Sequence, residues 1–197
     1  ADLAAEAQDL AEAQPAPAYP PAHNLLAGKT VLITAAAGTG IGFATAKRAT
    51  EEGATVMISD IHERRLNEAA ARIEAETGRK PLSHLCNVTK QADVDGLVAA
   101  AIAGLGRVDV LVNNAGLGGS APLHEMTDEQ WNIVLDVTLT GTFRMMRAML
   151  PHMMERKAGI IVNNASVLGW RAQKLQAHYA AAKAGVMALT RCAAMEA

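Results

Sequence analysis

TVLITAAAGTGIG, residues 30–42, joins two local patterns within a single short stretch. Thr30–Thr34 is a short, continuous apolar run of the kind found in strands that are buried on both faces of a sheet. Three glycines follow, and Gly40–Glu52 has the composition of a helix that Gly53 ends. The stretch therefore predicts a buried strand, a glycine-rich turn and a helix in direct succession.

The alternation of short strands and helices continues along the rest of the chain. Further strands are predicted at Thr55–Ser59, Leu82–Cys86, Val108–Val112 and Gly159–Asn163, and further helices at His62–Thr77, Lys90–Leu105, Asp128–Arg156 and His178–Glu196. We expect Gly141 and Pro151 to interrupt the fourth of these five helices. The pattern indicates an α/β fold with a Rossmann-type, doubly wound parallel sheet, in which ligands bind at the carboxyl ends of the strands.

The first 27 residues have a different composition from the rest. Residues 1–14 are rich in Ala, Glu and Gln and could form a short helix, whereas residues 15–22 (PAPAYPPA) contain four prolines and predict an extended linker. We interpret residues 1–27 as an N-terminal appendage, either docked on a neighbouring subunit or disordered. Residues 28–197 are then one dinucleotide-binding domain.

Composition argues against several classes of partner. The net charge is −2 and half of the 197 residues are hydrophobic, so no basic face for nucleic acid is expected. No apolar run approaches the roughly 20 residues that span a bilayer. The six histidines are not spaced as metal ligands, so no structural zinc site is expected. The two cysteines are far apart and no secretory signal is visible, which together favour a reducing, cytoplasmic location.

Gly38, Thr39, Gly40, Ile41 and Gly42 form the candidate phosphate loop. Glycines between a strand and a helix let the backbone approach a pyrophosphate, and the helix N-terminus offers unpaired N–H groups. The alternative is a turn with no ligand.

Asp60 ends the second predicted strand, 18 residues beyond Gly42 (60 − 42). A carboxylate at this place accepts hydrogen bonds from the ribose hydroxyls of the adenosine and repels a 2′-phosphate, which favours NAD. Asp60 could instead cap the next helix with Glu63. Arg64 and Arg65 could attract a 2′-phosphate, so NADP stays possible.

Ser166, Tyr179 and Lys183 are the candidate catalytic residues. Tyr179 and Lys183 are four residues apart in a predicted helix and share one face, so the cation would favour the phenolate. The phenol could then act as general base toward an alcohol or general acid toward a ketone, while Ser166 donates to the substrate oxygen. Alternatively, Ser166 is a cap, and Tyr179 packs on the core with Lys183 in solvent.

Taken in order, these motifs resemble the short-chain dehydrogenase/reductase family over residues 28–197. The resemblance rests on TAAAGTGIG at 34–42, Asp60, Asn87-Val88, NNAG at 113–116, Ser166, and YAAAK at 179–183. It implies a pyrophosphate along Gly40–Gly42, adenine beside Asn87 and Val88, and the nicotinamide ribose beside Asn114, Ala115, Gly116, Tyr179 and Lys183. It also implies a homotetramer.

Three features depart from the family pattern. The glycine motif has one extra residue, with Ala in place of its first Gly. Thr138 stands where the family has an Asn that helps to hold a water connecting Lys183 to solvent, which makes Thr138 a fourth candidate catalytic residue. It can substitute if the backbone carbonyl holds the water, whereas proton relay would be slower if the side chain is required. The chain ends at Ala197, whereas the family continues with further strands and a substrate loop, so we expect the C-terminal part of the fold to be missing.

The resemblance is strongest to 3-oxoacyl thioester reductases and to bacterial dehydrogenases of steroid-derived rings, which often act on CoA thioesters. We therefore expect hydride transfer between NAD(P) and a secondary alcohol or ketone, with a CoA or ACP thioester as candidate substrate. Trp170 and the methionines near 145–154 would suit a bulky apolar substrate, although methionine at helical spacing is also ordinary core. Alternatives are a dehydratase or epimerase of the same fold, or a non-catalytic nucleotide-binding protein.

Overall fold

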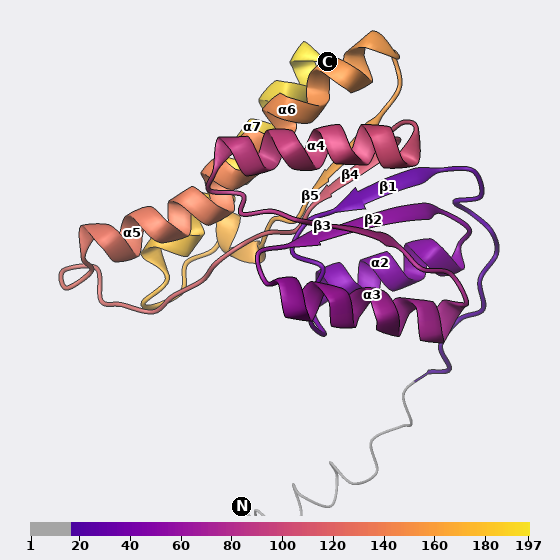
Figure 1. Cartoon of the computed structure of the whole chain (residues 1–197). Coiled ribbons are helices and arrows are strands. Elements are labelled where there is room, and N and C mark those ends of the chain that lie inside the picture. The colour runs from indigo at the N-terminus through magenta and orange to yellow at the C-terminus, as the bar shows by residue number, and fades with distance from the viewer. Residues whose placement is uncertain (1–16) are drawn as a thin grey trace, which may run out of the picture.

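The computed structural model describes residues 17–197 and contains one parallel sheet of five strands (Figure 1). The strands are β1 (Thr30–Ile33), β2 (Thr55–Asp60), β3 (Leu82–Leu85), β4 (Val110–Asn113) and β5 (Ile160–Asn163). Their order across the sheet is β3-β2-β1-β4-β5. The chain reverses its direction of winding between β1 and β4, which is the place where doubly wound sheets bind their ligands. The predicted fold class is confirmed.

Helices cover both faces of the sheet (Figure 1). α2 (Ile41–Glu51) and α3 (Glu63–Thr77) lie on one face, and α4 (Gln91–Leu105), α6 (Gly141–Glu155) and α7 (Ala177–Glu196) lie on the other. Two apolar clusters fill the layers. One joins β1 and β2 to α2 and α3, and the other joins β1, β2 and β4 to α4 and α6.

The long helical stretch after β4 differs from the prediction. It consists of α5 (Asp128–Leu135), a π-helical turn at Asp136–Thr140, and α6, so the irregularity comes before Gly141 and α6 runs through Pro151. Gly141 is present for packing, since a Cβ there would lie 2.8 Å from Cγ2 of Val88. Pro151 removes one helical hydrogen bond, and the buried Met149 and Met153 beside it hold the helix in place.

The N-terminal segment also differs from an extended linker without contacts. Residues 17–24 form no helix or strand, but they run along α2 of their own chain. The carboxylate of Glu52 accepts hydrogen bonds from the backbone N–H groups of His23 (2.9 Å) and Leu25 (3.0 Å). The helix expected within residues 1–14 lies outside the described residues.

Candidate functional site

The glycine loop leaves β1 and is held against the end of β2. Ala35 adopts a φ of 50° and Gly38 a φ of 97°, which together turn the chain toward α2. The N–H of Ala36 donates to the Ser59 carbonyl (3.0 Å), and the N–H of Ala37 donates to Asp60 Oδ2 (3.2 Å). These bonds fix the first half of the loop and leave its second half open to solvent.

The open half of the loop fits a pyrophosphate. A Cβ added at Gly38 or Gly40 would meet no atom within 4 Å, and Gly40 begins α2 without a side-chain cap. Thr39 and Ile41 are exposed beside this space. The free N–H groups and the partial positive charge of the helix N-terminus suit an anion there.

Gly42 differs from the other two glycines because it is buried against the loop itself. A Cβ at this position would lie 2.4 Å from the carbonyl oxygen of Ala35 and 2.6 Å from Nδ2 of Asn114. Gly42 therefore lets α2 pack closely on the ends of β1 and β4.

Asp60 lies half-buried at the end of β2. Its Oδ2 accepts from Ala37, and its Oδ1 accepts from the N–H of His62 at 3.1 Å. The alternative of a helix cap is wrong, because His62 is the N-cap of α3 and no side chain caps that end. Asp60 joins the glycine loop to the start of the β2–α3 connection.

Asn87 and Val88 follow β3. Asn87 Oδ1 accepts from the N–H (3.0 Å) and hydroxyl (2.8 Å) of Thr89, which shapes a tight turn. The side chain of Val88 is buried against Gly141, so only its backbone is available to a ligand.

Asn114, Ala115 and Gly116 extend from β4 across the reversal point of the sheet. The hydroxyl of Thr34 accepts from the N–H groups of Asn114 (3.0 Å) and Ala115 (3.1 Å). A Cβ at Gly116 would lie 3.6 Å from Lys183 Nζ, so this segment passes directly beside the lysine.

Tyr179 and Lys183 share one face of α7, as predicted. Lys183 Nζ lies 5.5 Å from the centre of the Tyr179 ring and donates to the Asn164 carbonyl at 2.5 Å. The alternative of a solvated lysine is wrong, because Lys183 is only 4% exposed. This burial lowers the pKa of its ammonium group.

Ser166 follows β5 and begins a short 3₁₀ turn at Val167–Gly169. Its Oγ accepts from the N–H of Leu168 at 3.2 Å, so Ser166 does cap this turn. An acceptor role leaves the hydroxyl hydrogen free to donate to a ligand.

Thr138 is fully buried in the π-helical turn. Its hydroxyl accepts from the N–H of Leu117 (3.0 Å) and donates to the carbonyl of the same residue (3.1 Å). Its carbonyl accepts from the Thr142 hydroxyl at 2.8 Å. Thr138 therefore fixes the segment that follows Gly116.

Two contributors were missed from the sequence. Thr34 holds the NNAG segment, and Asn164 holds both Lys183 and Asn114. A polar residue directly after a predicted strand was the available signal for each.

Residues 17–197 contain no helix long and apolar enough to cross a membrane. Over the same residues, no group of three or more His, Cys, Asp or Glu side chains is arranged to hold a metal ion.

The family model described as short chain dehydrogenase matches residues 29–197. The chain belongs to this family. Its members include oxidoreductases that use NAD(P), and this chain is one of them.

Named relatives cover most of the chain. A Mycobacterium tuberculosis protein named (5R,7aS)-5-hydroxy-7a-methyl-1-oxo-2,3,5,6,7,7a-hexahydro-1H-indene-carboxyl-CoA reductase is 61% identical over 89% of this chain. The 3-oxoacyl-acyl-carrier-protein reductase FabG of Thermotoga maritima is 39% identical over 87% of it. This chain spans 67% and 69% of those two proteins.

A crystal structure of a short chain dehydrogenase from Mycobacterium smegmatis superposes with a TM-score of 0.88 at 57% identity. The match covers 93% of this chain and 77% of that one. The relationship to this dehydrogenase family therefore holds for both sequence and fold.

Proposed function

We propose that this short-chain dehydrogenase transfers hydride between NAD(H) and a ring ketone or ring alcohol carried as a CoA thioester. The observation that carries the reaction class is Lys183, which is buried beside Tyr179 at the end of β5 and next to Gly116. The substrate class is supported by the 61% identity to a reductase whose name specifies an indene-carboxyl-CoA. A 3-oxoacyl thioester is the second candidate, supported by the 39% identity to FabG.

The bound nicotinamide supplies or accepts the hydride. Tyr179 donates its phenolic proton to the ketone oxygen in the reducing direction and takes it from the alcohol in the oxidising direction. Ser166 donates a hydrogen bond to the same oxygen as charge develops on it. Lys183 places its ammonium group beside Tyr179, 5.5 Å from the centre of the ring.

The nucleotide is assigned to the surface formed by the glycine loop, Asp60 and the segment after β4. Gly38–Gly42 would face the pyrophosphate, Asn87 and Val88 the adenine, and Asn114–Gly116 the nicotinamide ribose. Thr138 holds the residue that follows this last segment, Leu117, and so acts as a positioning residue.

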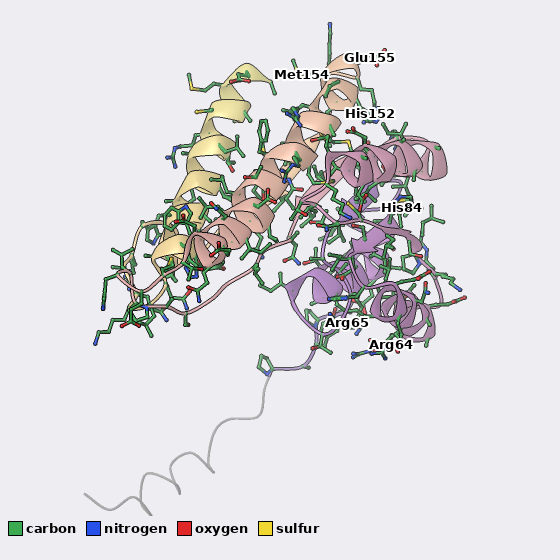
Figure 2. All side chains as sticks on the ribbon, turned by 60° about the vertical axis from the view of Figure 1, so that its left-hand side comes forward. Arg64, Arg65, His84, His152, Met154 and Glu155 are labelled. Carbon is green, nitrogen blue, oxygen red and sulfur yellow. The ribbon has the colours of Figure 1, made fainter. Side chains whose placement is uncertain are left out.

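The geometry around Asp60 supports NAD over NADP. Its carboxylate lies where the ribose hydroxyls of the adenosine would bind, and its charge would repel a 2′-phosphate. Arg64, at the start of α3 (Figure 2), pairs with Glu68 at 2.8 Å. Arg65 beside it is exposed, and either arginine could attract a phosphate, because the Arg64–Glu68 pair is itself exposed.

We also propose a cytoplasmic homotetramer. Ile133 of α5 and Phe143 of α6 are 47% and 38% exposed, and such apolar side chains on neighbouring helices would be covered by a second copy. Cys86 and Cys192 are both free thiols, in keeping with a reducing compartment. Light scattering of the purified protein measures the number of copies directly.

Titration with NADH and NADPH, followed by nucleotide fluorescence, tests the cofactor assignment. Tight binding of NADH with weak binding of NADPH is expected, and the reverse order would give the 2′-phosphate to Arg64 or Arg65. If neither nucleotide binds, the proposal fails.

Tyr179→Phe tests the reaction. This variant should lose at least about 100-fold in rate with both ring-ketone and 3-oxoacyl CoA thioesters, because the proton donor is gone. Its melting temperature should stay close to that of the wild type, which serves as the control for folding. An unchanged rate would overturn the assigned chemistry.

A further inference from the structure

Two adjacent asparagine pairs link the ends of β4 and β5. Asn113 lies opposite Asn163 in register, and its Nδ2 donates to Asn163 Oδ1 at 2.8 Å. One residue later, Asn164 Nδ2 donates to Asn114 Oδ1 at 2.9 Å. Successive side chains of a strand point to opposite faces of a sheet, so the two pairs serve different surroundings.

The two asparagine pairs contact different parts of the molecule. Asn163 continues to the Thr190 hydroxyl of α7 at 2.9 Å, which is a contact within the packed layer. Asn114 continues to the glycine loop, where its Nδ2 donates to the Ala35 carbonyl at 3.0 Å. The first pair is a packing contact, and the second pair reaches the nucleotide surface.

A chain of hydrogen bonds joins the lysine of α7 to the glycine loop through this second pair. Lys183 Nζ donates to the Asn164 carbonyl, the Asn164 amide donates to Asn114, and the Asn114 amide donates to Ala35. Ala35 is the residue that turns the loop with a φ of 50°. The positions of the lysine and of the loop are therefore linked through two side-chain amides.

The direction of these bonds gives Asn164 its importance. A primary amide carries an acceptor on one side and donors on the other. Because Asn164 presents an N–H to Asn114 Oδ1, the Nδ2 of Asn114 must face the Ala35 carbonyl. Without that N–H, only the bond to the Ala35 carbonyl would still orient the Asn114 amide, and its side chain would be less firmly fixed.

We propose that Asn164 is a positioning residue for the nicotinamide dinucleotide, acting through the orientation of Asn114. This inference rests on the proposed function, since it concerns the same nucleotide surface. Asn164 holds the Asn114 amide, the Ala35 turn and the Lys183 ammonium in one arrangement before the nucleotide arrives. Its loss therefore weakens nucleotide binding more than it weakens the fold.

Asn164→Ala and Asn163→Ala are the matched test, because each removes one member of an equivalent amide pair on the same strand end. The melting temperature of each variant and its affinity for NADH are measured on the whole chain. Both variants should melt below the wild type. Only Asn164→Ala should lose affinity, by about fivefold, which corresponds to one net hydrogen bond.

Asn164→Asp is the second variant, and it keeps the size of the side chain while replacing the N–H donor by oxygen. It should lose NADH affinity as Asn164→Ala does, because neither variant presents a donor to Asn114. Wild-type affinity in this variant would overturn the proposal.

A double-variant cycle tests the route of action. If Asn164 acts through Asn114, the double variant Asn164→Ala/Asn114→Ala should bind NADH no more weakly than Asn114→Ala alone. Additive losses, or equal losses in Asn164→Ala and Asn163→Ala, would overturn the inference while leaving the proposed function standing. A wild-type protein that binds neither NADH nor NADPH would instead overturn the proposed function.

Discussion

Gly40 and Gly42 are two residues apart, but the missing side chain has a different consequence at each. Gly40 has φ −85° and ψ −164°, an extended conformation open to any residue, and nothing lies within 4 Å of its Cβ position. Gly42 has no such space, because the Ala35 carbonyl and the Asn114 amide occupy it. The missing side chain at Gly40 therefore leaves free space at the nucleotide surface, whereas the missing side chain at Gly42 allows close packing.

Alanine substitutions should separate these two roles. Gly40→Ala should melt close to the wild type but lose at least about tenfold in NADH affinity, because its methyl group would enter the space assigned to the pyrophosphate. Gly42→Ala should be destabilised by about 1–3 kcal/mol, the cost typical of overpacking. Urea unfolding and nucleotide titration of both variants provide the measurements, and equal stabilities would contradict the distinction.

The sequence predicted that Tyr179 and Lys183 share a helix face, because spacing of four residues implies it. It did not predict that Lys183 is buried, since its neighbours Gly116 and Asn164 come from the ends of other strands. The role of Asn164 was unpredictable for the same reason. Its partner Asn114 is 50 residues away, and no local pattern reports on such a contact.

At the scale of elements, four of the five strands were predicted from a short, mainly apolar run, and Leu82–Cys86, which contains Ser83 and His84, was predicted from its place between two helices. Their observed ends differ from the predicted ends by two residues or fewer. The error lay in the helix after β4, where Gly141 was interpreted as a breaker. Its contact with Val88, from a segment 53 positions earlier (141 − 88), explains the glycine, and the sequence gives no sign of that contact.

Thr138→Val tests the π-helical turn. The substitution keeps the size of the side chain but removes both hydrogen bonds to Leu117, so the N–H group of Leu117 loses its acceptor. We expect a loss of about 1–3 kcal/mol in the free energy of unfolding. Thr138→Ser keeps the hydroxyl and should fall between valine and wild type in urea unfolding. If Thr138→Val were as stable as wild type, the hydroxyl would have no structural role.

Asp109 connects the starts of β1 and β4, at the opposite end of the sheet from the nucleotide. Burial acts to raise its pKa, but hydrogen bonds from Arg107, from Arg156 and from the N–H of Thr30 together hold the pKa well below its usual range. A lowered carboxylate pKa stabilises the fold above the unfolded value near 3.9, and this contribution is lost as the pH falls through the folded value.

Asp109→Asn should therefore destabilise the protein in a pH-dependent way. At pH 7 the loss should be about 2 kcal/mol, the scale of a hydrogen bond to a charged group. The difference from wild type should begin to shrink as the pH drops below about 4, because the carboxyl then takes up a proton in the unfolded chain while it stays charged in the folded protein. Thermal melts from pH 3 to pH 7 check this, and a constant difference would contradict the role of the charge.

At the scale of the whole molecule, the described part of the N-terminal segment is tied to α2. The guanidinium of Arg48 donates to the carbonyls of Pro20 (2.7 Å) and Pro21 (3.0 Å), and the Tyr19 hydroxyl donates to Glu51 at 2.6 Å. Most of these bonds involve backbone groups of the segment. The pattern of side chains in the segment therefore predicted its extended form but could not predict where it binds. The domain boundary between residues 27 and 28 stays a prediction.

Glu52 is the central anchor of this attachment, because hydrogen bonds from the N–H groups of Leu25 and His23 lower the pKa of its carboxyl. Glu52→Ala should release residues 17–25, lower the melting temperature and speed proteolysis of the segment.

NADH affinity should stay unchanged in this variant, since the nucleotide surface lies at the other end of α2, about 16 Å away for eleven residues. Glu51→Ala removes the hydrogen bond from Tyr19 together with the ion pairs to Lys47 and Arg48 within α2, but it leaves the bonds from His23 and Leu25 in place. It is the control and should have a smaller effect. In the wild type the attachment should hold above the ordinary glutamate pKa near 4.3 and weaken as the pH falls through the lowered value. Proteolysis that is equally slow in Glu52→Ala and wild type at pH 7 would show that the segment is held by other contacts.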